Sequence, residues 1–139
     1  MNDGGQGMAV FAQWVVIAAG VWLIGLGLWM ALFPRRALRT LAAMGGSTAV
    51  HFGEMITRLL VGAALAAAAA LSRCPQAVLV VGGFLIVSAL ILMALPRRWH
   101  AGYSTWWAAR IPILAVRLVA PFSVIAGAVL IWVMIPGPA

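Results

Sequence analysis

Four long apolar blocks dominate the sequence and limit the folds that are open to it. They cover residues 11–33, 50–71, 77–95 and 111–135, and each is close to the ~20 residues that a helix needs to cross the hydrocarbon core of a bilayer. Apolar residues make up 65% of the chain, against about half in a soluble protein. Backbone polar groups in lipid must be satisfied within the protein. The sequence therefore predicts one all-α integral membrane domain, 1–139, with four transmembrane helices and the lipid bilayer as its surroundings.

The arginines indicate the orientation of these helices. Three of them lie between the first two blocks and three between the last two, whereas Arg73 stands alone between the second and the third. By the positive-inside rule, the two arginine-rich loops are cytoplasmic and both termini lie outside the cytoplasm. The formal charge of +7 thus follows topology and does not indicate nucleic acid as a partner. The N-terminal tail "MNDGGQG" has no Lys or Arg, so the first block is expected to be a retained helix. The single cysteine, Cys74, excludes an internal disulfide.

A short pattern occurs twice in the chain. "LFPRRALRTL" ends the first block and "ALPRRWHAGY" ends the third. When Pro34 is aligned with Pro96, "TRLLVGAAL" (57–65) falls near "VRLVAPFSV" (116–124), so that Arg58 matches Arg117. We expect two parallel helix-hairpin repeats, 11–72 and 77–135, because two successive units in one chain have the same membrane orientation.

Each Pro-Arg-Arg leads into a segment that is expected to be amphipathic and to lie on the cytoplasmic interface. "RRALRTLAAMGG" predicts a short surface helix, and "RRWHAGYSTWWAAR" places aromatic residues at helical spacing. Anchoring to anionic lipid headgroups is the expected role, and a groove for a quinone, a pigment or a lipid is the alternative. The candidate interfacial contacts are Arg35, Arg36, Arg39, Arg97, Arg98, Trp99, Tyr103, Trp106, Trp107 and Arg110.

The segment "HFGEMITRLL" (51–60) is the main polar interruption of the apolar blocks. His51, Glu54 and Arg58 share one face of a helix. Thirteen residues, 59–71, follow Arg58 before the outer turn; they span about 20 Å, which places Arg58 roughly 10 Å below the cytoplasmic boundary. Glu54 precedes Arg58 by four residues, the favourable order for an ion pair. In the repeat alignment, Ile113 answers Glu54, so the polar spot belongs to one half only.

Three interpretations of this intramembrane polar site remain open. The pair could fix helix packing or hold a neighbouring subunit. Glu54 could instead titrate and couple a proton or an ion, with Arg58 tuning it. In the third interpretation, His51, Glu54 and His100 form a metal site, or the histidines ligate haem.

Small residues indicate close helix packing. "GAALAAAAAL" (62–71) is nearly all small side chains, and Gly25, Gly27, Gly82 and Gly83 lie on the first and third blocks. Helix association in lipid depends on such close packing. Four helices cannot give every such face an internal partner, so we expect contacts with other subunits or with copies of the chain. Pro121 lies inside the fourth block and predicts a kink.

Each half resembles a bacterial family of small two-helix inner-membrane proteins of unknown function. "GLGLWMALFPRRALRTLAAM" followed by "TRLLVGAAL" carries the likeness over residues 25–65, whereas the second half matches at its Pro-Arg-Arg and Arg-Leu. The resemblance implies a bacterial inner-membrane protein and an accessory role in a larger complex. It implies no catalytic residues.

The sequence favours a non-catalytic function. It contains no catalytic Ser/His/Asp set, no cysteine pair and no phosphate-binding glycine loop, so we do not expect an enzyme. No cofactor is indicated beyond the open alternatives of haem, a quinone, a pigment or a metal. Ser88 and Ser123 are expected to bond backbone carbonyls. The leading hypothesis is an accessory or structural subunit of a larger membrane complex or homo-oligomer. The alternative is a small homo-oligomeric channel or transporter, coupled to protons or ions, that uses Glu54 and Arg58.

Overall fold

The computed structural model describes residues 3–44, 48–94, 106, 110 and 112–135, and this part of the chain is helical with no strand. The elements are α1 (Asp3–Leu32), α2 (Pro34–Met44), α3 (Thr48–Ala68), the 3-10 turn η1 (Ala69–Leu71), α4 (Pro75–Ala94) and α6 (Ile113–Met134). Four segments are long and apolar enough to cross a membrane: Gly4–Leu32, Phe52–Leu71, Pro75–Ala94 and Ile113–Met134. The prediction of an all-helical, multi-pass membrane protein is confirmed at this level.

The first helix is longer than the sequence predicted. It begins at Asp3, so most of the segment expected to be a tail is helical. Its 30 residues extend over about 45 Å, more than the ~30 Å of hydrocarbon. The extra turns contain no proline, and they carry the unpaired N–H groups of the helix end away from the apolar region, where such groups are costly.

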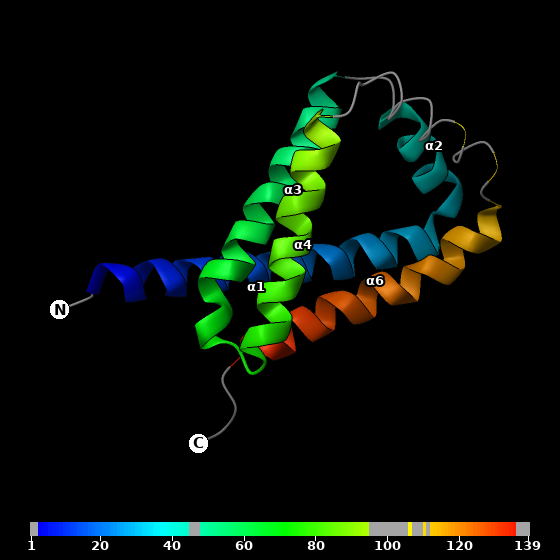
Figure 1. Ribbon diagram of the computed structural model, residues 1–139. Coiled ribbons are helices and arrows are strands. Elements are labelled where there is room, and N and C mark those ends of the chain that lie inside the picture. The colour runs from blue at the N-terminus through cyan, green and yellow to red at the C-terminus, as the bar shows by residue number, and fades with distance from the viewer. Residues whose placement is uncertain (1–2, 45–47, 95–105, 107–109, 111, 136–139) are drawn as a thin grey trace.

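The four long helices form two close pairs. α1 runs alongside α6, and α3 runs alongside α4 (Figure 1). The two pairs cross near the η1 turn and diverge toward α2, as Figure 1 shows. The buried cluster lies at the crossing and draws residues from every long helix: Ala12, Val16, Ala64, Leu65, Ala68, Ala69, Val78, Val133 and Met134.

A pair of glycines brings α3 and α4 into backbone contact. A Cβ atom on Gly62 would lie 2.9 Å from the carbonyl oxygen of Gly82, and a Cβ on Gly82 would lie 2.8 Å from the oxygen of Gly62. Real side chains do not tolerate such distances to backbone. Only glycine fits at both positions while the helices stay this close.

A second glycine pair joins α1 to α6 in the same way. A Cβ atom on Gly127 would collide with the carbonyl oxygen of Gly20 and would lie 2.8 Å from Cγ1 of Ile24. A Cβ on Gly62 would meet the corresponding atoms of α4, the oxygen of Gly82 and Cγ1 of Ile86, each at 2.9 Å. The two helix pairs are therefore closed by contacts of the same kind.

Hydrogen bonds tie the C-terminal end of α6 to two other parts of the chain. Nε2 of Gln13, on α1, donates to the carbonyl oxygen of Met134 at 2.5 Å. The backbone N–H of Arg73 donates to Val133 (3.0 Å), and its Nε donates to Ile135 (2.8 Å). These donors satisfy carbonyls that a helix end leaves without partners.

At the opposite end α1 passes into α2 through a single residue. The carbonyl oxygen of Phe33 accepts the backbone N–H groups of Arg36 and Ala37, both at 3.0 Å. Pro34 opens α2, a position where the missing N–H of proline costs nothing. This turn carries α2 across to the start of α6 (Figure 1).

Substituting adjacent glycines of α4 separates backbone contact from helix propensity. We expect Gly82→Ala to lower the free energy of unfolding by about 1–3 kcal/mol, the usual cost of overpacking. Gly83→Ala is the matched control, because a Cβ there meets nothing within 4 Å. It should leave stability unchanged or slightly higher. Thermal unfolding in one detergent measures both, and equal midpoints for the two variants would contradict the packing described above.

Candidate functional site

Glu54 and Arg58 form an ion pair on α3. Nη2 of Arg58 donates to Oε1 of Glu54 at 2.8 Å. The geometry follows from the helix, because side chains four residues apart are neighbours and Cα–Cβ bonds tilt toward the helix N-terminus. The later residue, Arg58, therefore reaches back to Glu54, as the order of the two residues predicted.

The pair lies inside a segment that can cross the membrane. That segment begins at Phe52, so Arg58 lies six residues, or about 9 Å, along the helix from its start. The side chains of Arg58 and Glu54 are 32% and 36% exposed. A charged pair in the apolar part of α3 is thus only partly covered by the chain itself.

The neighbours of the pair define its place on α3. Met55 and Gly62 are buried against the rest of the bundle, whereas Ile56 and Leu60 are exposed apolar residues. The pair lies between these two faces. It therefore borders the surface of the bundle instead of being enclosed within it.

The metal interpretation falls largely outside the described part of the chain. The side chain of His51 and the whole of His100 are not among the described residues. Within the residues that are described, no three His, Cys, Asp or Glu side chains gather where they could hold a metal ion. A site that combines Glu54 with the two histidines stays a prediction.

Several predicted interfacial residues are described by the structure. Arg35, Arg36 and Arg39 are exposed on α2. The guanidinium carbon of Arg110 lies 4.0 Å from the ring centroid of Trp106. The remaining candidates lie outside the described residues: Arg97, Arg98, Trp99, Tyr103 and Trp107.

The serines of the long helices bond backbone carbonyls, as expected. Oγ of Ser88 donates to Leu85 of its own helix at 2.9 Å. Oγ of Ser123 donates to Leu23 at 2.8 Å, and so links α6 to α1.

Sequence reasoning missed the structural roles of two arginines. Arg73 served only as a topological marker, yet it binds the end of α6 and stacks 4.9 Å from the ring centroid of Trp132. Arg117 served only as the counterpart of Arg58 in the repeat, yet it lines a cavity together with residues of α1 and α2. The sequence signal available for Arg73 was its isolation, since it is the one charged residue between the second and third apolar blocks. Nothing in the local sequence signals the cavity, because its walls are about 80 residues apart.

Comparisons with protein-family models, curated proteins and solved structures found no match for this chain. The resemblance to small two-helix bacterial membrane proteins therefore stays a prediction.

Removing one partner of the ion pair should be worse than removing both charges. We expect Glu54→Gln to destabilise the protein by about 1–3 kcal/mol, because an unpaired arginine in an apolar segment cannot neutralise itself. Arg58→Gln should cost less, since a lone carboxyl group can take up a proton. The double variant should be more stable than Glu54→Gln alone. Thermal unfolding of the three variants measures their order of stability, with Thr57→Val as a neighbouring control. Equal losses of stability in all three variants would contradict the prediction.

Proposed function

We propose that this protein is a non-catalytic subunit of a membrane assembly, formed with a larger complex or with copies of itself. The observation that carries the proposal is the Glu54–Arg58 pair, one third exposed on a membrane-crossing helix. Ionised groups are costly in hydrocarbon and normally face protein or water. A partner surface over this part of α3 would cover the pair and supply polar contacts.

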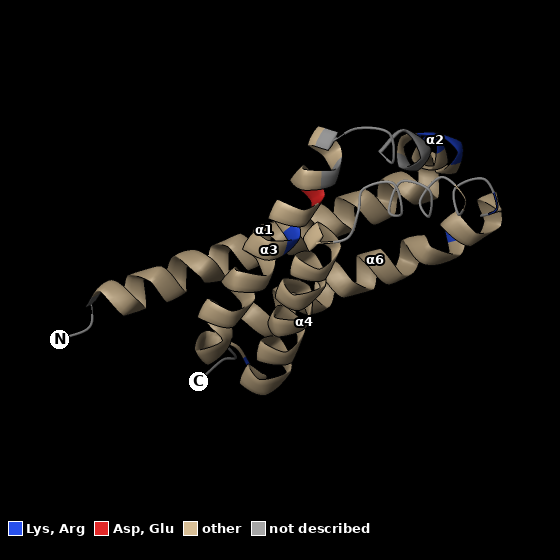
Figure 2. Ribbon diagram, turned by 45° about the horizontal axis from the view of Figure 1, so that its top comes forward, with Lys and Arg blue, Asp and Glu red and all other residues tan. Residues whose placement is uncertain are grey.

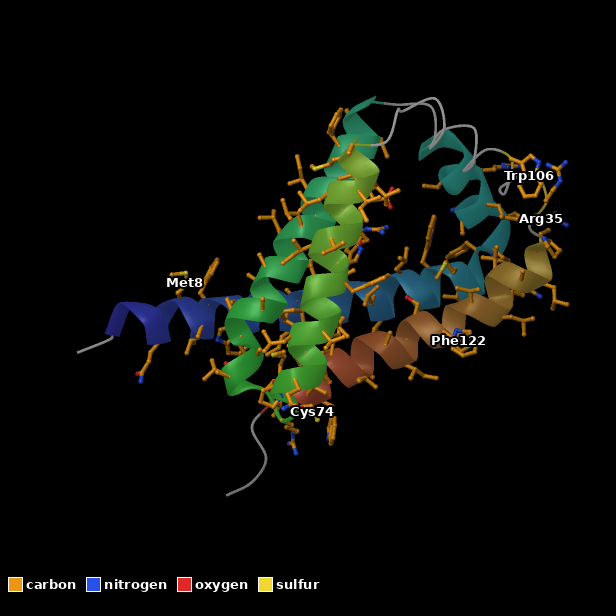
Figure 3. All side chains as sticks on the ribbon, in the orientation of Figure 1. Met8, Arg35, Cys74, Trp106 and Phe122 are labelled. Carbon is orange, nitrogen blue, oxygen red and sulfur yellow. The ribbon has the colours of Figure 1, made fainter. Side chains whose placement is uncertain are left out.

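The thinness of the bundle supports the same proposal. In the most apolar stretches of α1, α4 and α6, only 17% of the residues are buried, against 33% in the stretch on α3. Large apolar side chains such as Trp22, Phe84 and Phe122 are about 70% exposed. Phe122 projects away from the other helices in Figure 3. The helices thus retain broad faces that suit lipid or other subunits.

Transport is the less favoured function. A path through the protein needs polar groups along its length, and the helices offer few beyond the ion pair. The donor groups of Gln13, Ser88 and Ser123 are engaged with backbone carbonyls. These groups hold the bundle together, which favours a packing role over a conduction path.

We further infer that the chain contains two helix-pair repeats. Three residues of the first long helix have counterparts 62 positions later: Gly20 with Gly82, Ile24 with Ile86 and Pro34 with Pro96. The glycine contacts of the two pairs use these same positions. A duplicated unit whose halves pack in the same way accounts for this correspondence.

The second helices favour a register that differs from the Arg58–Arg117 match. Thr48 and Ile113, which begin α3 and α6, are 65 residues apart. The same separation holds for the contacting glycines, Gly62 and Gly127. In this register Ser123 is the counterpart of Arg58 in the second repeat. The ion pair belongs to one half in either register, which supports a role for it beyond the shared fold.

The same proposal places the protein in a bacterial inner membrane. The arginine-bearing α2 and the first turns of α6 lie at one end of the bundle (Figure 2). With this end at the cytoplasmic face, the positive-inside rule is satisfied and both termini lie outside the cytoplasm.

Native mass spectrometry of protein extracted from its own membranes tests the proposed assembly. We expect the wild-type chain to be recovered with foreign subunits or as a homo-oligomer. Glu54→Leu combined with Arg58→Leu should reduce the assembled fraction at least about fivefold, the effect of losing ~1 kcal/mol of contact. The pair is internal to α3, so its joint removal should leave the fold of the single chain intact.

Thr57→Val provides the control for this experiment. Thr57 is exposed on the same helix, and its hydroxyl bonds only Gly53 of its own turn. This variant should assemble as the wild type does, and thermal unfolding of each sample checks its fold. A wild-type chain that is monomeric and alone would refute the proposal, as would a folded double variant that assembles normally.

A further inference from the structure

A cavity at the arginine-rich end brings together two distant parts of the chain. Its volume is about 480 Å³, and it lies where α1 turns into α2 beside the beginning of α6. Its walls are Leu32, Phe33, Pro34, Arg35, Arg36, Ile113 and Arg117. Arg35 lies at this end of the molecule in Figure 3, far from Cys74 at the opposite end.

The three arginines of the cavity have no carboxylate within the protein to balance them. The whole chain has two acidic residues. One of them, Asp3, begins α1 at its opposite end, and the other, Glu54, is bound to Arg58. Arg35, Arg36 and Arg117 are all exposed, so an anion from outside the chain can reach them.

Three helix ends meet at the cavity. Pro34 and Ile113 are the first residues of α2 and α6, and Leu32 is the last residue of α1. The two N-termini carry partial positive charge and the C-terminus of α1 carries partial negative charge, so the helix ends largely offset one another. The positive charge of the cavity therefore comes from its three guanidinium groups. They suit an oxyanion, because arginine binds phosphate with two parallel N–H donors.

We propose that this cavity binds the phosphate of an anionic phospholipid headgroup. Phosphate is the shared chemistry of a lipid headgroup and free phosphate, and the apolar walls favour the lipid. Leu32, Phe33 and Ile113 line the cavity beside the arginines. Leu114 and Leu118, on the first turns of α6, are 65% and 59% exposed. A headgroup in the cavity can leave its acyl chains along this apolar surface.

The site requires α1, α2 and α6 to be correctly packed. Arg36 is held over the ring of Phe33, with 5.2 Å between the guanidinium carbon and the ring centroid. Arg117 reaches the same cavity from α6, which the Gly20–Gly127 contact holds against α1. A bound headgroup would thus link the end of α1 and the beginning of α6 to α2. This inference concerns a ligand and does not depend on the assembly proposed above.

Lipid titration followed by native mass spectrometry tests the site. The probes are dioleoyl phosphatidylglycerol, dioleoyl phosphatidylcholine with the same chains and no net charge, and inorganic phosphate. We expect phosphatidylglycerol to bind more tightly than phosphatidylcholine, and excess inorganic phosphate to displace it poorly. Arg117→Gln should weaken phosphatidylglycerol binding about fivefold, because it removes one of the three guanidinium groups that can pair with the phosphate. Arg117→Lys should recover part of this loss, because it restores the charge without the paired donors.

Arg39→Gln is the matched control, since Arg39 is exposed on α2 and does not line the cavity. Because Arg39 is a candidate interfacial contact outside the cavity, this variant should weaken binding clearly less than Arg117→Gln does. Equal weakening by Arg39→Gln and Arg117→Gln would overturn the site in favour of diffuse surface charge. A lack of preference for phosphatidylglycerol would also overturn it, and efficient displacement by inorganic phosphate would overturn the lipid assignment. Thermal unfolding monitors each variant, and Arg35→Gln replaces Arg117→Gln if the latter is unstable.

Discussion

Direct backbone contact at two glycine pairs holds this bundle together. Lipid provides little hydrophobic drive for helices to associate, so association relies on close packing and on hydrogen bonds between helices. Gly20 with Gly127 and Gly62 with Gly82 remove the side chains that would keep the backbones apart. Each contact determines the distance between the two helices of a pair and their register. The positions of the polar side chains on those helices follow from this packing.

The polar features depend on this packing in different ways. The Glu54–Arg58 pair is local to α3, so the helix alone creates it, and packing determines only how much of it is covered. The arginine cavity needs three helices in register, because Arg117 is about 80 residues from Arg35 and Arg36 in sequence. The ion pair therefore depends on one helix, whereas the cavity depends on three.

The sequence predicted the features that depend on composition and short spacing. Four helices followed from the length and hydropathy of the apolar blocks, and the ion pair followed from the four-residue spacing of Glu54 and Arg58. The predicted beginning of α1 was wrong, because the polar residues at positions 3–7 do not prevent the helix from including them. The sequence also gave no means of separating Gly82, which lies in a helix contact, from its neighbour Gly83, which does not. That difference depends on helix rotation, which tertiary packing sets.

The hydrogen bonds at the end of α6 determine how the two helix pairs can move. Gln13 and Arg73 join α1, the turn after α3 and the last residues of α6 at a single place. The bonds of Arg73 join the two pairs, so we expect relative motion of the pairs to pivot about this place. Displacement is then greatest at the opposite end, where the pairs diverge (Figure 1) and where α2 and the beginning of α6 lie. A bound anion or a covering partner at that end would therefore restrict the relative motion of the two helix pairs where its amplitude is greatest.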